Sequence, residues 1–253
     1  MHRQAMRSRP VKLLRIAGHF CHAFWLVLVR FPRLQQEGRL LAIQHWARQM
    51  LGTLEINVHC SALPPAGFTG LVVSNHLSWL DILVLQSVLP GSFVAKSEVR
   101  RWPVVGYLAQ ACATIFVDRS SPRSARAMVE QTASAITRGY AVVVFPEGTS
   151  TDGRSLGTFH ANIFESAIRT GAPVQCLTLQ YQDRATGAAA TAAHFTGDMT
   201  LMASIASVTA TSDITALVHL GDCIPAQGHS RRSLALLAHQ AIHSRLLSEN
   251  HAT

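Results

Sequence analysis

Two kinds of apolar spacing divide the first part of the chain. Across residues 34–51 apolar side chains recur at steps of three and four, which is typical of one face of a helix. Across residues 54–60 they occupy every second position, which indicates a β-strand. An earlier apolar stretch, residues 11–30, also predicts a helix, and Pro32 separates the two. The chain is therefore expected to begin with two helices and a strand.

Beyond residue 60, short apolar runs alternate with longer helical patterns. The expected strands cover residues 71–73, 92–95, 114–117, 141–145, 173–181 and 213–220. The expected helices cover residues 79–89, 122–138, 161–170, 198–206 and 230–248. An irregular stretch at 183–197 is expected to lie on the surface. Strands that alternate with helices predict an α/β fold with a largely parallel central sheet flanked by helices.

Charge separates the first fifth of the chain from the rest. Residues 1–50 contain nine Lys or Arg side chains and one acid, Glu37, whereas basic and acidic residues balance in the remainder. The same segment is rich in Leu, Val, Phe and Trp, which favours an anionic membrane surface over nucleic acid as its partner. We therefore divide the chain into an amphipathic two-helix membrane-docking segment, residues 1–52, and an α/β domain, residues 53–253.

The composition agrees with a membrane-associated protein. Charged residues make up 14% of the chain and the mean hydropathy is +0.20, so some apolar surface is expected to face something other than water. Polar residues interrupt the stretch Leu13–Val29 and leave a run of seven, Ala23–Val29, which is short of the about 20 apolar residues that a spanning helix needs. An interfacial or re-entrant helix is favoured over a span.

Cysteine and histidine spacings do not indicate a metal site. The five cysteines are scattered and form no CxxC pair, which is typical of reduced thiols in a reducing compartment. The closest histidine pairs are His19/His22 and His239/His243, and no acid or further histidine completes a zinc pattern. We expect no metal ion.

A first polar block, Asn75-His76-Leu77-Ser78-Trp79-Leu80-Asp81, follows the strand at 71–73. His76 and Asp81 cannot meet on one helix, because five residues turn the side chains roughly 140° apart. They can meet if His76 lies in the turn and Asp81 in the first helical turn, as Ser78-x-x-Asp81 indicates. The pair would then be a histidine base oriented by a carboxylate. A plain helix cap beside a turn histidine is the alternative.

A second polar block, Phe145-Pro146-Glu147-Gly148-Thr149-Ser150, follows the strand at 141–145. Glu147 is expected to accept hydrogen bonds from substrate hydroxyls, or else to be a solvated loop acid. The N–H groups of Gly148 and Thr149 are expected to bind a phosphate or an oxyanion.

Cations follow two more strands. Arg119 comes after the strand at 114–117 and suits a phosphate, with a surface ion pair as its alternative. Lys96 is a second cation at a strand end.

The blocks resemble the glycerolipid acyltransferase family, in particular the bacterial 1-acylglycerol-3-phosphate acyltransferases. His76 and Asp81 match the family's His-x4-Asp block, Ile115–Arg119 its second block and Phe145–Thr149 its third. Ala172-Pro173-Val174 fits the fourth. The similarity covers roughly residues 70–180, and the family also carries an N-terminal helical pair for membrane docking.

The resemblance implies a reaction without a cofactor. His76 would deprotonate the hydroxyl of a lysolipid, Asp81 would orient it, and the alkoxide would attack an acyl thioester of coenzyme A or acyl carrier protein. Arg119, Glu147 and Gly148 would bind the head group. Expected partners are this lysolipid, the acyl donor and the cytoplasmic face of the inner membrane, in peripheral or monotopic attachment.

Three positions depart from the family pattern. Ser150 stands where many members have arginine, Cys176 replaces a frequent proline and Ala113 a frequent glycine. The missing arginine keeps another acceptor open, such as a lyso-ornithine-type aminolipid. Two alternatives from other functional classes also stay open. One is a lipid or thioester hydrolase, and the other is a non-catalytic lipid-binding module.

Overall fold

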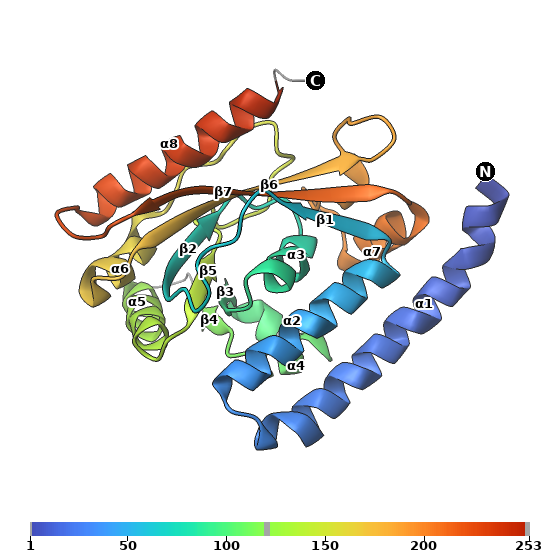
Figure 1. Cartoon of the computed structure of the whole chain (residues 1–253), viewed down its shortest axis with the longest axis horizontal. Helices are drawn as coiled ribbons and strands as arrows, with labels where there is room; N and C mark the ends of the chain where they lie inside the picture. The colour runs from blue at the N-terminus through green and yellow to red at the C-terminus, as the bar shows by residue number, and fades with distance from the viewer. Residues whose placement is uncertain (1, 119–121, 251–253) are drawn as a thin grey trace.

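A computed structural model describes residues 2–118 and 122–250. The described part of the chain forms a twisted sheet with helices on both faces, and a long N-terminal helix runs beside it (Figure 1). The helices are α1 (His2–Trp25), α2 (Gln36–Thr53), α3 (Leu80–Val88), α4 (Val105–Ala111), α5 (Pro122–Thr137), α6 (Glu165–Thr170), α7 (Leu201–Ala210) and α8 (Arg231–Asn250). The strands are β1 (Ile56–Cys60), β2 (Gly70–Ser74), β3 (Ser92–Lys96), β4 (Ile115–Val117), β5 (Ala141–Val144), β6 (Val174–Asp183) and β7 (Ile214–Ile224).

The strands lie in the order β1-β7-β6-β2-β5-β3-β4. Every neighbouring pair is parallel except β6 and β7, which are antiparallel. The expected α/β class with a largely parallel sheet is therefore confirmed. Because β2, β5, β3 and β4 are mutually parallel, their carboxyl ends lie along one edge of the sheet. Both polar blocks follow strands that end at this edge.

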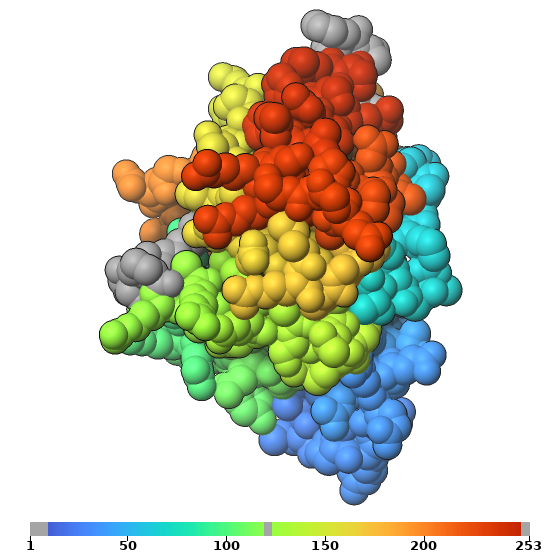
Figure 2. All heavy atoms as spheres, turned by 90° about the vertical axis from the view of Figure 1, so that its left-hand side faces the viewer, coloured from blue at the N-terminus to red at the C-terminus, as the bar shows by residue number. Residues whose placement is uncertain are grey.

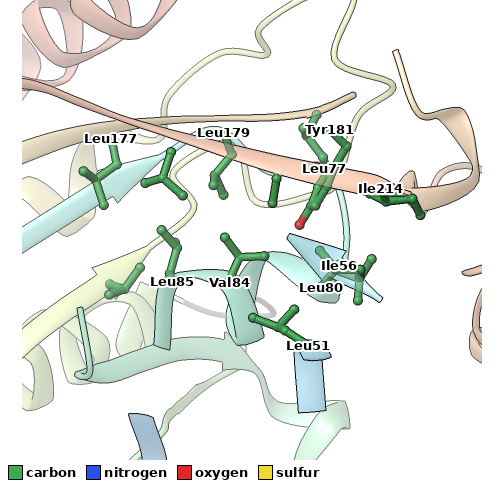
Figure 3. Packing of buried hydrophobic residues seen from close by; sticks show 14 of the residues in the cluster. Leu51, Ile56, Leu77, Leu80, Val84, Leu85, Leu177, Leu179, Tyr181 and Ile214 are labelled. Carbon is green, nitrogen blue, oxygen red and sulfur yellow. The ribbon is translucent and has the colours of Figure 1, made fainter. Parts of the chain in front are cut away.

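Helices cover the two faces of the sheet in separate groups. One face carries α5, α6 and α8, which Figure 2 shows from outside as the yellow-green, gold and red parts of the surface. The other face packs against α2 and α3, which bury Leu51, Val84 and Leu85 in a common core with the sheet (Figure 3). The central strands β2 and β5 are buried on both faces, which explains their unbroken apolar runs.

Most expected elements are present, with shifted ends. The strand expected from Leu54 begins at Ile56, because Leu54 ends α2 as a buried residue and Glu55 turns the chain at a φ of 59°. The first helix begins at His2 rather than residue 11 and contains Pro10. Residues 2–9 are polar and basic, so their spacing carried no helical signal.

Polar contacts hold α1 against the rest of the protein. Lys12 Nζ lies 2.6 Å from Glu55 Oε2, and His19 Nε2 lies 2.8 Å from Thr53 Oγ1. Trp46 Nε1 donates to the carbonyl of His19 at 2.9 Å. The helical stretch Pro10–Arg33 is long and apolar enough to cross a membrane, and 11% of its most apolar window is buried in the protein.

The second helix of the expected docking segment also belongs to the core. Met50 and Leu51 of α2 are buried in the same cluster as Val72 of β2. The boundary after residue 52 therefore separates the expected membrane-docking segment from the α/β domain by role only. The side chains of α2 pack continuously with those of the domain.

Candidate active site

His76 and Asp81 meet where β2 leads into α3. His76 lies in the turn after Ser74, and Asp81 lies in the first turn of the helix. The Nδ1 atom of His76 is 2.8 Å from Oδ2 of Asp81, so the predicted contact is present. The ring also stacks on Phe145, with centroids 4.0 Å apart and an angle of 12° between the planes. Among the described residues nothing hydrogen-bonds to Nε2 of His76.

Asp81 is fully buried and accepts four hydrogen bonds. Its Oδ2 atom accepts from His76 and from the backbone N–H groups of Leu77 at 2.7 Å and Ser78 at 2.9 Å. Its Oδ1 atom accepts from the hydroxyl of Tyr181 at 2.7 Å. Asp81 therefore caps α3 and holds the imidazole at once, so the two interpretations of this block are compatible. Since a carboxylate oxygen only accepts, Nδ1 carries the proton and Nε2 presents its lone pair.

Tyr181 was not among the residues singled out from the sequence. It comes from β6, 100 residues after Asp81, and Figure 3 shows its hydroxyl oxygen pointing toward the start of α3. Burial, and secondarily the charge of Asp81 and their hydrogen bond, raise the pKa of Tyr181 well above its usual range. The hydroxyl therefore stays protonated and remains a donor to Asp81. Nothing in the spacing of the chain indicated this contact.

Glu147 contacts the protein itself rather than facing solvent. Its Oε1 atom accepts from the backbone N–H of His76 at 2.9 Å, and its Oε2 atom accepts from the N–H of Gly157 at 2.8 Å. The side chain is buried, and burial raises the pKa of Glu147 while the two backbone hydrogen bonds oppose the shift. The interpretation of Glu147 as a solvated loop acid is therefore wrong. Glu147 joins the turn after β5 to the backbone of the histidine block, and binding of substrate hydroxyls stays a prediction.

Gly148 differs from the expectation of a free N–H group. Its N–H donates to the carbonyl of Phe145 at 3.0 Å, closing a turn in which Gly148 has a φ of 77°. The expectation of a free N–H group is therefore wrong, because the turn already uses the donor, and binding of a phosphate or an oxyanion at Gly148 stays a prediction. Thr149 is exposed beside it, and no described residue accepts its N–H.

The structure describes one of the two predicted cations. Lys96 is exposed at the last position of β3, and β3 lies next to β5 in the sheet. The structure thus places Lys96 on the edge that carries both blocks. Arg119 lies outside the described residues.

Asn75 connects two strands at this edge. Its side-chain amide donates to the carbonyl of Leu179 at 2.9 Å, and its carbonyl oxygen accepts from the N–H of Leu179 at 2.8 Å. The pair continues the pairing of β2 with β6 one residue beyond the last strand residue, Ser74. Asn75 therefore fixes the start of the histidine turn.

The stretch expected to lie on the surface also reaches the site. Phe195 donates its N–H to the carbonyl of Leu77 at 2.9 Å, and Ser150 Oγ donates to the carbonyl of Phe195. Ala190 and Ala193 are buried nearby. The expectation that residues 183–197 lie on the surface is therefore wrong for residues 190–195. Their contacts are made largely by backbone groups, which the pattern of side chains in the sequence does not reveal.

No group of three or more His, Cys, Asp or Glu side chains that could hold a metal ion occurs within residues 2–118 and 122–250.

Comparison with known proteins identifies the family. A family model described as acyltransferase matches residues 55–180, which contain both polar blocks. The lyso-ornithine lipid O-acyltransferase of Pseudomonas aeruginosa is 36% identical over 197 residues, covering 78% of this chain and 75% of that protein. The chain belongs to the acyltransferase family. The predicted resemblance of this chain to the acyltransferases is confirmed.

Further relatives agree with this assignment. The 1-acyl-sn-glycerol-3-phosphate acyltransferase of Neisseria meningitidis serogroup B is 37% identical over 148 residues, which is 58% of either chain. The crystal structure of the 1-acyl-sn-glycerophosphate (LPA) acyltransferase PlsC from Thermotoga maritima has a TM-score of 0.67 and 19% identity, covering 95% of this chain and 97% of that one. The acyltransferase thus shares its fold with PlsC.

Proposed function

We propose that this acyltransferase moves a fatty acyl chain from an acyl thioester to the free hydroxyl of a lysolipid, with 1-acylglycerol-3-phosphate as acceptor and phosphatidic acid as product. The 2.8 Å contact between His76 and the buried Asp81 carries the proposal. No described serine or cysteine hydrogen-bonds to the His76 ring, so the described residues offer the base no protein nucleophile to activate. A hydroxyl of the acceptor fills that role.

The proposed reaction balances without a cofactor. Nε2 of His76 takes the proton of the acceptor hydroxyl while its oxygen attacks the thioester carbonyl. The new C–O bond forms, the C–S bond breaks, and the departing thiolate receives the proton from His76. Asp81 stabilises the imidazolium between these steps. No acyl-enzyme is formed, and the donor is acyl-CoA or acyl carrier protein.

Three groups suit an anionic head group. Lys96 is an exposed cation at the carboxyl end of β3, no described residue accepts the N–H of Thr149, and Arg119 follows β4 in the sequence. A phosphate attracts both cations and N–H donors. The relatives from Neisseria species, named for 1-acyl-sn-glycerol-3-phosphate, support the same acceptor.

A lyso-ornithine-type lipid is a second candidate acceptor. Ser150 stands at the position of the missing arginine, and its hydroxyl donates to the carbonyl of Phe195 rather than facing an anion. The Pseudomonas aeruginosa relative is named for this lipid. One fewer cation is compatible with a head group that carries its own positive charge.

Transfer from a labelled long-chain thioester to a panel of lysolipids tests the proposal. We expect acylated 1-acylglycerol-3-phosphate as the main product. A product from lyso-ornithine lipid alone would keep the mechanism and select the second acceptor. Thioester cleavage without an acylated lipid would indicate a hydrolase, and no turnover would indicate a binding module.

We further propose that the enzyme docks on the cytoplasmic face of the inner membrane as a peripheral or monotopic protein. The outer side of α1 exposes apolar residues, while Lys12 and His19 on its inner side contact Glu55 and Thr53. A spanning α1 would break these contacts and carry charged groups into the hydrocarbon, which is costly. A helix lying in the interface keeps them.

Salt dependence of vesicle binding checks this placement. We expect the protein to float with vesicles that contain phosphatidylglycerol, and to be released progressively as salt rises, because each basic residue contributes about 1 kcal/mol at an anionic surface. Replacement of the exposed Arg15, Arg30 and Arg33 by glutamate leaves the buried residues of α2 in place and should strongly weaken flotation. Binding that resists salt and yields to detergent alone would contradict interfacial docking.

A further inference from the structure

Three large apolar side chains are exposed on the turn that enters α4. Trp102, Val104 and Tyr107 expose 39%, 40% and 44% of their surfaces. The turn follows the 3₁₀ turn Ser97–Arg101, which starts directly after the carboxyl end of β3. We call residues 102–107 the apolar turn. It therefore emerges from the same edge of the sheet as the histidine block.

Backbone contacts hold the apolar turn in shape. Val104 has a φ of 67°, which a β-branched residue rarely adopts because of steric crowding. The N–H of Gly106 donates to the carbonyl of Trp102 at 3.0 Å, and a Cβ added at Gly106 would lie 2.4 Å from the carbonyl oxygen of Arg100. The turn is thus closely packed at its base while its apolar side chains face outward, so their exposure is not a result of loose structure.

The apolar turn is continuous with the exposed side of α1. Tyr107 stacks on Phe24, with ring centroids 5.5 Å apart and 19° between the planes. Beyond Phe24 the chain exposes Trp25 and Leu28. Figure 1 shows α4 beside the carboxyl-terminal half of α1, and Figure 2 shows the green and blue segments at one end of the molecule.

Exposed arginines flank this apolar surface along the chain. Arg100 and Arg101 lie at the base of the apolar turn, and Arg30 and Arg33 lie at the end of the N-terminal helical stretch. Tryptophan and tyrosine prefer the boundary between water and lipid, and arginine extends its charge to anionic head groups while its stem covers apolar surface. Exposed apolar side chains flanked by basic residues match an anionic lipid surface.

We infer that the apolar turn is a second membrane-insertion element, which binds an anionic bilayer together with α1. The inference rests on the proposed docking of the enzyme and goes beyond it by assigning a second, sequence-distant contact. One helix lying in the interface leaves the protein free to roll about the helix axis. A second contact at the carboxyl edge of the sheet fixes that rotation and turns His76 toward the lipid surface, where both long-chain substrates are held.

Fluorescence quenching by brominated acyl chains tests insertion directly. We expect vesicles containing phosphatidylglycerol and brominated lipid to quench the wild-type protein, and Trp102→Phe to lose part of this quenching. The Trp79→Phe variant is the matched control, since Trp79 is partly buried and bonded to Ser204, and the quenched component should survive it. Neither measurement needs turnover. Equal quenching in wild type and Trp102→Phe would overturn the inference.

A combined Trp102→Ser and Tyr107→Ser variant tests the energetic contribution. We expect vesicle affinity to fall about tenfold, because two aromatic side chains no longer enter the lipid. The apparent KM for acceptor in vesicles should rise, while kcat on a monomeric short-chain acceptor stays at the wild-type value. Leu236→Ser with Leu247→Ser, which changes exposed leucines on α8, is the matched control and should leave vesicle affinity unchanged.

The possible failures are distinguishable. Vesicle binding at wild-type affinity, with a loss of transfer from acyl carrier protein alone, would assign the apolar turn to a protein donor and overturn the lipid assignment. Quenching of Trp102 in a protein that acylates no lysolipid would support insertion and contradict the proposed function. An unquenched Trp102 in the wild-type protein, together with loss of binding when Arg15, Arg30 and Arg33 are replaced by glutamate, would leave α1 as the membrane contact and overturn the second one.

Discussion

Replacement of His76 by alanine is expected to lower kcat for acyl transfer by about 10²- to 10⁴-fold, which is the usual contribution of a positioned general base. The imidazole is the group on this site whose free nitrogen can take the acceptor proton, since its other nitrogen is bound to Asp81. KM for the acceptor should change little, because the base acts in the transition state rather than in binding. Steady-state kinetics on the acceptor panel, with product detected as the acylated lipid, measures the effect.

The His160→Ala variant is the control for this substitution. His160 is exposed, and its backbone N–H, which the substitution keeps, donates to the carbonyl of Pro146. The His160→Ala variant removes an imidazole side chain close to the second polar block and leaves His76 unchanged. We expect wild-type kcat from it and an unchanged circular dichroism spectrum from both variants. Substantial transfer by His76→Ala would assign the base elsewhere.

The elements that the sequence predicted well are those with local signals. The strand–helix alternation and the break near Pro32 depend on neighbouring residues and are present in the structure. The antiparallel pairing of β6 with β7 had no such signal, because the direction of a strand depends on how the chain connects in space. The start of β1 was shifted for a similar reason, since Leu54 fits the alternation and yet completes the buried end of α2.

The candidate site likewise contains residues that local spacing predicted and residues that it did not. His76 and Asp81 are five positions apart, and the helix signature at Ser78 was enough to predict that they meet. Tyr181 lies 100 residues from Asp81 and contacts it through a pairing of elements that no spacing encodes. Glu147 was misread in part, because a carboxylate between proline and glycine resembles an exposed turn until the N–H of Gly157 is placed against it.

Replacement of Asp81 by asparagine is expected to lower kcat by about 10²- to 10⁴-fold, by analogy with the orienting carboxylate of a catalytic triad. The amide can keep its carbonyl oxygen toward His76, Leu77 and Ser78 and direct its NH₂ group at Tyr181, whose hydroxyl can turn to accept. The fold is therefore expected to survive. What is lost is the negative charge that stabilises the imidazolium, so the effect should fall on kcat and leave KM nearly constant.

The Tyr181→Phe variant separates charge from packing. It removes one of the four donors to Asp81 and keeps the carboxylate beside His76. Since Oδ1 then lies buried without this donor, we expect unfolding free energy to fall by about 1–3 kcal/mol, with a loss of kcat of less than roughly tenfold. Thermal melting and kinetics of both variants distinguish the two effects. If Asp81→Asn retains kcat while Tyr181→Phe loses it, the carboxylate is a structural cap and the orienting role assigned to it is wrong.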